Sequence, residues 1–408
     1  MNSSYSAATR PQRLTQWSKS LWPRALEALS AWLPSLPEYL RRSAAKFRDL
    51  GVEQYTKHNT APAITYFLEA LRWTPKDPAL LCDLAQIYYE AGDLGSAERE
   101  FRKALKYDPS YARALKALGV VLHARGQLSE AQYFYLQYLE QNRTDVDVLF
   151  NLGAAFQDSG KYEQALRYYG RAEKLDRSNT LILENRARCL YALGKFEDAA
   201  VTLHRALELD PTNSSVQSLL AMALEAMGHD DEALSHYMAI LDREPEQAAP
   251  RLEAAQLLER IGSYDQAAAR ALQALELCEK QHDTEGMKMA CWHLGWIYYR
   301  LRDFDHSVQF SSRAVELDPK LFPARFNLAL VLALLGRSEQ ALKEYEQGIA
   351  DLSQPSDFKY YAIDDLAEAL KKGDGQPEAQ KVLDILQRKY KALKQTRRRG
   401  GNVNVAPA

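Results

Sequence analysis

Hydrophobic residues in this chain fall into short segments of helical spacing, about fourteen residues each, and the segments come in pairs. One pair has its apolar positions at Leu81, Leu84, Ala85 and Tyr88 and then at Ala97, Phe101 and Ala104. Spacings of three and four residues place each set on one face of an amphipathic helix. Between them lies Gly92, and glycine adopts the left-handed backbone that ends a helix at little cost. The pattern predicts a helical hairpin.

The hairpin pattern recurs with a period of 34 residues. The turn glycine returns at Gly92, Gly126, Gly160, Gly194, Gly228 and Gly262. An alanine follows each by five residues (Ala97, Ala131, Ala165, Ala199, Ala233, Ala267), and a small residue precedes each by seven (Ala85, Gly119, Gly153, Ala187, Ala221, Ala255). The register extends back to Gly51, His58 and Ala63 and, after a shift of six, forward to Gly295, Arg302, Ser307, Ala329, Gly336 and Ala341. Nine copies are therefore predicted, with small residues where the two helices touch.

These positions resemble the tetratricopeptide repeat, which has a bulky residue, leucine, glycine or alanine and an aromatic on one helix, then alanine, an aromatic and alanine on the next. One copy reads Leu149, Leu152, Gly153, Phe156, Ala165, Tyr169 and Ala172. The resemblance implies an all-α fold, an α-solenoid of nine to ten helix-turn-helix repeats in a right-handed superhelix. Such an array has one continuous core.

The repeats suggest a layout for the 408 residues. Residues 1–43 form a basic, tryptophan-rich segment, residues 356–394 a degenerate repeat or capping helices, and residues 395–408 a basic tail expected to be disordered. The nine repeats are expected at 44–77, 78–111, 112–145, 146–179, 180–213, 214–247, 248–287, 288–321 and 322–355.

The repeats depart from the family pattern in a few places. His58 and Arg302 stand where a turn glycine is expected, and Ser307 stands in place of an alanine. Six additional residues near Cys278–Gly286 indicate a longer second helix or a longer loop in the seventh repeat.

In the family, the first helix of each repeat lines the concave surface. In the eighth copy the packing positions are Cys291, Leu294, Gly295 and Tyr298, which leaves Trp292, His293, Trp296 and Tyr299 on the other face. Phe326 holds the corresponding position in the next repeat. We expect these aromatic side chains to be exposed in the groove, because exposed aromatics are frequent interaction hot spots. The alternative is that repeat packing, or the six additional residues, buries them.

Polar candidates extend this surface. Asn151, Asn185 and Asn327 could pair with an extended peptide backbone, because an amide both donates and accepts, although Leu219, Glu253 and His293 interrupt the series. Arg188 and Tyr89 could add contacts along the groove. Lys116 and Asn151 match part of a family clamp for a C-terminal carboxylate. The second cationic pair of that clamp is missing, which argues against it.

The sequence does not favour metal or enzyme chemistry. Cys278, His282, Cys291 and His293 are possible zinc ligands by type, but Cys291 takes a packing position and the spacing fits no tetrahedral zinc pattern. No glycine-rich phosphate loop, nucleophile elbow or pair of catalytic carboxylates stands outside the repeat pattern. We expect no metal, no cofactor and no catalysis.

The net charge of −2 hides a strong asymmetry. Residues 1–48 carry +6 and residues 381–408 carry +7, which leaves −15 between them. An acidic body disfavours nucleic acid as a partner. Scattered cysteines, no apolar run near the ~20 residues that span a bilayer and no signal-like segment favour the cytoplasm, with membrane-peripheral contact as an option.

Residues 12–33 include an apolar stripe of helical spacing with basic residues beside it. The stripe consists of Trp22, Ala25, Leu26, Leu29, Trp32 and Leu33. The segment could cap the first repeat, dock to a partner or a second copy of the chain, or lie in a membrane interface.

Taken together, these features predict a non-catalytic scaffold that binds a peptide or helix of another protein in the concave groove and so assembles a complex. The alternatives are a membrane-peripheral assembly factor tethered through the N-terminal segment, and a regulatory subunit of an enzyme.

Overall fold

The structure of the protein, a computed structural model, describes residues 36–350 and 355–399. These residues form helices and short turns and contain no strand, which confirms the all-α prediction for the described part of the chain. The chain divides into two compact units, residues 1–209 and residues 210–408.

The N-terminal unit contains α2 (Leu36–Thr56), α3 (Thr60–Trp73), α4 (Pro78–Glu90), α5 (Leu94–Tyr107), α6 (Ala112–Ala124), α7 (Leu128–Gln141), α8 (Val146–Asp158), α9 (Tyr162–Leu175), α10 (Thr180–Ala192) and α11 (Phe196–Leu209). The C-terminal unit contains α12 (Ser214–Ala226), α13 (Asp230–Arg243), α14 (Ala248–Arg260), α15 (Tyr264–Gln281), α16 (Thr284–Arg300), α17 (Phe304–Leu317), α18 (Phe322–Leu334), α19 (Ser338–Ala350), α20 (Pro355–Phe358), the π-helix η1 (Lys359–Asp364), α21 (Asp365–Lys371) and α22 (Pro377–Arg399).

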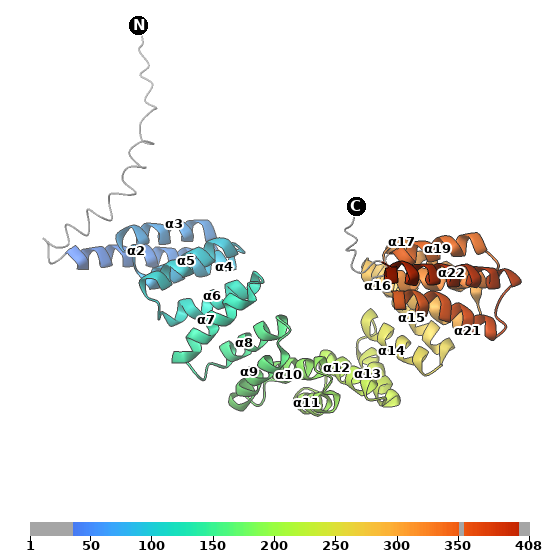
Figure 1. The fold of residues 1–408 in the computed structure, drawn as a ribbon. Coiled ribbons are helices and arrows are strands. Elements are labelled where there is room, and N and C mark those ends of the chain that lie inside the picture. The colour runs from blue at the N-terminus through green and yellow to red at the C-terminus, as the bar shows by residue number, and fades with distance from the viewer. Residues whose placement is uncertain (1–35, 351–354, 400–408) are drawn as a thin grey trace, which may run out of the picture. The chain divides into compact units, whose positions relative to one another are not determined.

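Successive helices pack as hairpins, from α2–α3 to α18–α19. Within each unit a hairpin also packs on the next, as the ordered colours in Figure 1 show. The first helices of neighbouring hairpins touch as well, for example α4 with α6 and α16 with α18. Within each unit this is the predicted solenoid stacking.

Close helix contacts are made by a ring of the second helix resting on a glycine of the first. A Cβ added to Gly119 would lie 2.5 Å from the ring of Tyr135, and one added to Gly153 would lie 2.7 Å from the ring of Tyr169. Both tyrosines are fully buried. The rings could not approach the backbone this closely past any larger residue.

The hairpin turns share one backbone conformation. The expected turn glycines have positive φ: Gly92, Gly126, Gly160, Gly194, Gly228, Gly262 and Gly336. His58 and Arg302 take their place with φ of 59° and 63°. For these side chains the left-handed conformation is strained, so the turn geometry is kept at some cost in stability.

The six additional residues of the seventh copy lengthen two helices. α15 has 18 residues and α16 has 17, whereas the equivalent helices α5 and α4 have 14 and 13. His282, with φ of 56°, ends α15. The groove residues of α16 are therefore not covered by a folded loop.

Ser307 stabilises the eighth hairpin in a way that alanine could not. Its buried hydroxyl donates a hydrogen bond to the carbonyl of Gly295, at 2.6 Å. Gly295 is tightly packed as well, since an added Cβ would meet the Ser311 hydroxyl at 2.2 Å. The serine thus fits the small-residue position and ties the two helices together.

The helices at the two ends extend beyond the predicted limits. α2 begins at Leu36, before residue 44, where the first repeat was expected to start. α22 continues to Arg399, so the tail predicted as disordered over 395–408 is helical in its first residues. α22 packs on α18 and α19 and buries Val382 and Leu386, as a capping helix would. The stripe at residues 12–33 lies outside the described residues.

Ala199 tests the register in the N-terminal unit. It is completely buried in α11 at a helix–helix contact position. We expect Ala199→Phe to lower the free energy of unfolding by about 1–3 kcal/mol, because a ring cannot enter a packed contact without strain. Urea denaturation followed by circular dichroism measures this. A neutral result would show that the helix pairing is misassigned.

Candidate peptide-binding site

A cavity of about 460 Å³ lies in the C-terminal unit and gathers most of the predicted aromatic face of α16. Helices α14, α16, α18, α21 and the π-helix η1 contribute its walls. The lining residues are Glu259, Trp292, His293, Trp296, Tyr299, Arg300, Pro323, Asn327, Tyr360, Tyr361, Asp365, Glu368 and Lys372. Five candidates chosen from the sequence therefore share one cavity: Trp292, His293, Trp296, Tyr299 and Asn327.

The aromatic wall of the cavity, formed by Trp292, Trp296 and Tyr299, is half-buried. This result lies between full exposure in the groove and burial by repeat packing, the two alternatives that the sequence left open. Trp292 packs partly on the core of α14–α17, and Trp296 and Tyr299 pack partly on the core of α18–α22. The Trp296 and Tyr299 rings lie 5.0 Å apart between centroids. Each of these rings is anchored on one side and lines the cavity on the other.

Phe326 does not line the cavity, and the prediction that it is exposed in the groove is wrong. Only 2% of its surface is exposed. The ring of Tyr361 stacks on it at 5.8 Å, with 15° between the ring planes. Because η1 covers Phe326 in this way, Tyr360 and Tyr361 of η1 line the cavity and Phe326 does not.

The cavity contains several charged groups, most of which have partners. Lys372 donates to Glu368 at 2.6 Å, and the guanidinium of Arg300 lies 4.7 Å above the Tyr264 ring and 6.0 Å from the Trp296 ring. His293 Nδ1 lies 3.4 Å from Glu259. His293 Nε2 is buried and has no hydrogen-bond partner among the described residues.

Asp365 is the exception. Its carboxylate lines the cavity, and within the described part of the chain it has neither a hydrogen bond nor an ion pair. Burial, together with the nearby charges of Glu368 and Asp364, raises its pKa to about 6. Burial and the charges of Asp374, Asp365 and Glu368 raise the pKa of Tyr299 to about 12. The cavity is thus an aromatic recess with an unneutralised carboxylate.

Five models of the tetratricopeptide repeat match the sequence, at residues 82–146, 134–167, 156–223, 290–321 and 323–347. The matches fall in both units. The chain belongs to the tetratricopeptide-repeat family. No curated protein matches it in sequence.

Solved structures similar to this tetratricopeptide-repeat chain include one from Parabacteroides merdae, itself a tetratricopeptide repeat protein. It is 18% identical, with a TM-score of 0.51, over 62% of this chain and 98% of that one. Yeast Tom70 is 14% identical over 87% of this chain and 97% of its own, with a TM-score of 0.42. YrrB, described as having an unusual peptide-binding site, is 22% identical over 44% of this chain and 92% of its own, with a TM-score of 0.41. These likenesses concern the fold alone.

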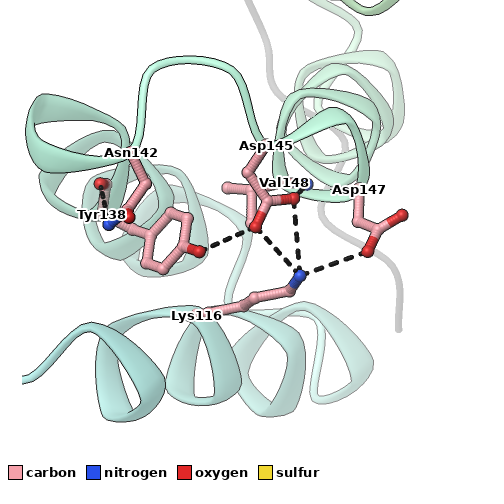
Figure 2. Close-up of polar contacts among 6 residues, drawn as sticks. All are labelled: Lys116, Tyr138, Asn142, Asp145, Asp147 and Val148. Carbon is pink, nitrogen blue, oxygen red and sulfur yellow. Dashed lines mark hydrogen bonds and ion pairs between the residues drawn. The ribbon is translucent and has the colours of Figure 1, made fainter. Parts of the chain in front are cut away.

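The remaining candidates belong to the N-terminal unit of the repeat array, where Lys116 already has partners. Figure 2 shows its ammonium group between Asp145 and Asp147, at 3.1 and 3.2 Å. Asp145 also accepts from the Tyr138 hydroxyl at 2.7 Å and from the backbone N–H of Val148, where it caps α8. A peptide carboxylate would have to compete with both aspartates, so Lys116 is poorly placed as a carboxylate clamp.

Several other polar candidates of this unit are also engaged. The Asn185 side-chain amide donates to the Leu181 carbonyl of its own helix at 2.9 Å, and Arg188 pairs with Glu184 at 2.7 Å. Asn151 is half-buried, and Tyr89 packs partly on the core. These residues lie on first helices, as expected, but none of them lines the cavity of the C-terminal unit.

The four cysteines of this chain are buried free thiols. Burial raises the pKa of the Cys291 thiol to about 11 and that of Cys82 to about 12. In the described ranges, no group of three or more His, Cys, Asp or Glu side chains is arranged to hold a metal ion. None of the described helices combines the length and apolarity needed to cross a membrane.

Proposed function

We propose that this chain is a non-catalytic scaffold that holds a peptide or helix of another protein in the groove of its C-terminal unit. The family is one of protein-interaction scaffolds, and the site within it is our assignment. One observation carries that assignment: the cavity joins two half-buried tryptophans, an amide and charged groups from five different elements.

The size and chemistry of the cavity support peptide binding. Its volume of about 460 Å³ lies in the range of pockets that enclose small ligands, roughly 300–1,000 Å³. Trp292 and Trp296 are held by the core on one side, so a partner could pack on them without first ordering them. Asn327 supplies an amide that can both donate to and accept from a peptide backbone.

Selection from a random library of displayed 16-residue peptides tests the proposal. We expect the full-length protein to retain peptides that the Trp292→Ala/Trp296→Ala double variant does not retain. Trp73→Ala is the matched control, because Trp73 is a half-buried tryptophan of α3 in the other unit. Retained peptides that bind the double variant equally well would place binding elsewhere and contradict the proposed site.

A further inference from the structure

We propose that the partner peptide inserts a basic side chain, arginine or lysine, into this cavity, between the tryptophan wall of α16 and the carboxylate of Asp365. The inference rests on the proposed function and names the chemistry that the site selects. Four features support it: the pairing of the charges, the burial of Asp365, the aromatic faces and a second partly buried acid on the neighbouring helix.

The charges of the cavity leave one acid without a cation. Among the lining residues, Glu368 is neutralised by Lys372, and Glu259 lies beside His293. Arg300 is held over the rings of Tyr264 and Trp296. The charges that act on Asp365 come from two further acids, Glu368 and Asp364. A ligand that brings a positive charge would complete this arrangement.

Burial makes the unpaired carboxylate costly. A partly desolvated carboxylate is destabilised unless it is paired or hydrogen-bonded. Neither kind of partner for Asp365 is found in the described part of the chain, although its side chain is half-buried. A basic side chain from a partner would offset this penalty, whereas an acidic side chain or a C-terminal carboxylate would add a further negative charge.

The aromatic wall favours the same ligand. The faces of tryptophan and tyrosine attract cations through their quadrupoles. Arg300 already makes such contacts with Tyr264 and Trp296 inside the protein. A second cation beside Asp365 would share the cavity with the rings of Trp296, Tyr299 and Tyr361, which line it. Its methylene groups would pack on these rings while its charged end meets the carboxylate.

A second partly buried acid, Glu253 of α14, lies near the cavity-lining His293. Glu253 stands on α14 where the family often has asparagine, and it has no hydrogen bond or ion pair in the described ranges. Burial and the charge of Glu225 raise its pKa, and His293 lowers it. A basic residue of the partner on the α14 side of the cavity would therefore be favoured over an acidic one.

Peptide selection on three forms of the full-length protein tests the inference. The wild type is expected to enrich peptides that share a lysine or arginine at one position, and Asp365→Asn is expected to bind them about tenfold or more weakly. Asp384→Asn is the control, because this carboxylate of α22 is exposed, lies outside the cavity lining and is not among the charges that act on Asp365. It should change the affinity less than about twofold.

A double-mutant cycle, which combines Asp365→Asn with a change in the peptide, measures the interaction between the two charged groups directly. In the wild-type protein, a synthetic peptide with its basic residue replaced by glutamine should also lose about tenfold. In Asp365→Asn the same peptide change should have little further effect, because the two groups interact. Melting temperatures of the variants show whether each one is folded.

The pH dependence provides a third readout. The titratable and charged groups that face Asp365 or line its cavity are Glu259, His293, Tyr299, Arg300, Tyr345, Tyr360, Tyr361, Asp364, Glu368 and Lys372. Above a pH of about 6 the Asp365 carboxyl is ionised, and below it the group is protonated and its attraction for a cation is lost. Affinity for the basic peptide should fall between pH 7.5 and 5, and Asp365→Asn should flatten that fall.

The outcomes separate the two proposals. Enriched peptides that require Trp296 but share no basic residue, or that bind Asp365→Asn as well as wild type, would overturn the basic anchor and leave the proposed function intact. Peptides that bind independently of Trp292 and Trp296 would overturn both proposals.

Discussion

Replacing Trp296 by alanine is expected to weaken binding of a selected peptide roughly 30-fold, which corresponds to about 2 kcal/mol. The ring lines the cavity and is supported from behind by the core of α18–α22, so a partner gains contact area without ordering a mobile side chain. Fluorescence anisotropy with a labelled peptide measures the change.

The melting temperature separates binding from folding. Trp296→Ala should lose clearly less stability than the removal of a fully buried ring, because part of the Trp296 ring lies outside the core. Phe326→Ala is the contrasting control: this ring is 2% exposed, and its removal should cost about 3–5 kcal/mol of stability. If both variants lose the same stability, Trp296 belongs to the core, and the prediction that it contacts a partner is contradicted.

Replacing Gly153 by alanine is expected to lower the free energy of unfolding by about 1–3 kcal/mol, even though alanine favours helix. The added methyl group would lie 2.7 Å from the ring of Tyr169, and this ring is completely enclosed. The two helices α8 and α9 would have to separate to make room. Chemical denaturation measures the loss.

Gly170 offers a matched control in the partner helix of the same hairpin. An added Cβ there meets nothing within 4 Å. Gly170→Ala should therefore be neutral or stabilise the protein by up to about 1 kcal/mol, through helix propensity alone. Equal effects at the two positions would mean that the ring–glycine contact does not control helix spacing.

The fold could be predicted from the sequence because each key position of the repeat requires a particular type of residue, and the requirement has a single physical cause. The turn glycines have positive φ, and the alanines of the second helices are buried. Even the exceptions fit: His58 and Arg302 adopt the glycine conformation, and Ser307 adds a hydrogen bond without adding much volume.

The candidate site could be predicted only as far as the repeat extends. The repeat register predicts the face of α16 that carries Trp292 and Trp296, and both residues line the cavity. Phe326 was assigned to the same face, but η1 stacks Tyr361 on it. A π-helix has more residues per turn than an α-helix, so the faces of Tyr360, Tyr361 and Asp365 do not follow from α-helical spacing. Adjacent tyrosines followed by Asp364 and Asp365 were the available signal.

The ion pairs of Lys116 also lay beyond what the sequence alone indicates. Its partner Asp145 comes from the next repeat and serves at the same time as the cap of α8. A repeat pattern assigns Lys116 to a face, but it does not say which side chain of the neighbouring hairpin reaches across.

The turns at His58 and Arg302 have a practical consequence. At the corresponding turns of the other repeats a glycine adopts positive φ without steric strain. His58 and Arg302 adopt the same positive φ, which is sterically unfavourable for a residue with a side chain. Glycine at either point would relieve that strain at the expense of a more flexible unfolded chain. The turns of the first and eighth repeats are therefore the positions where a glycine substitution could raise the stability of the array.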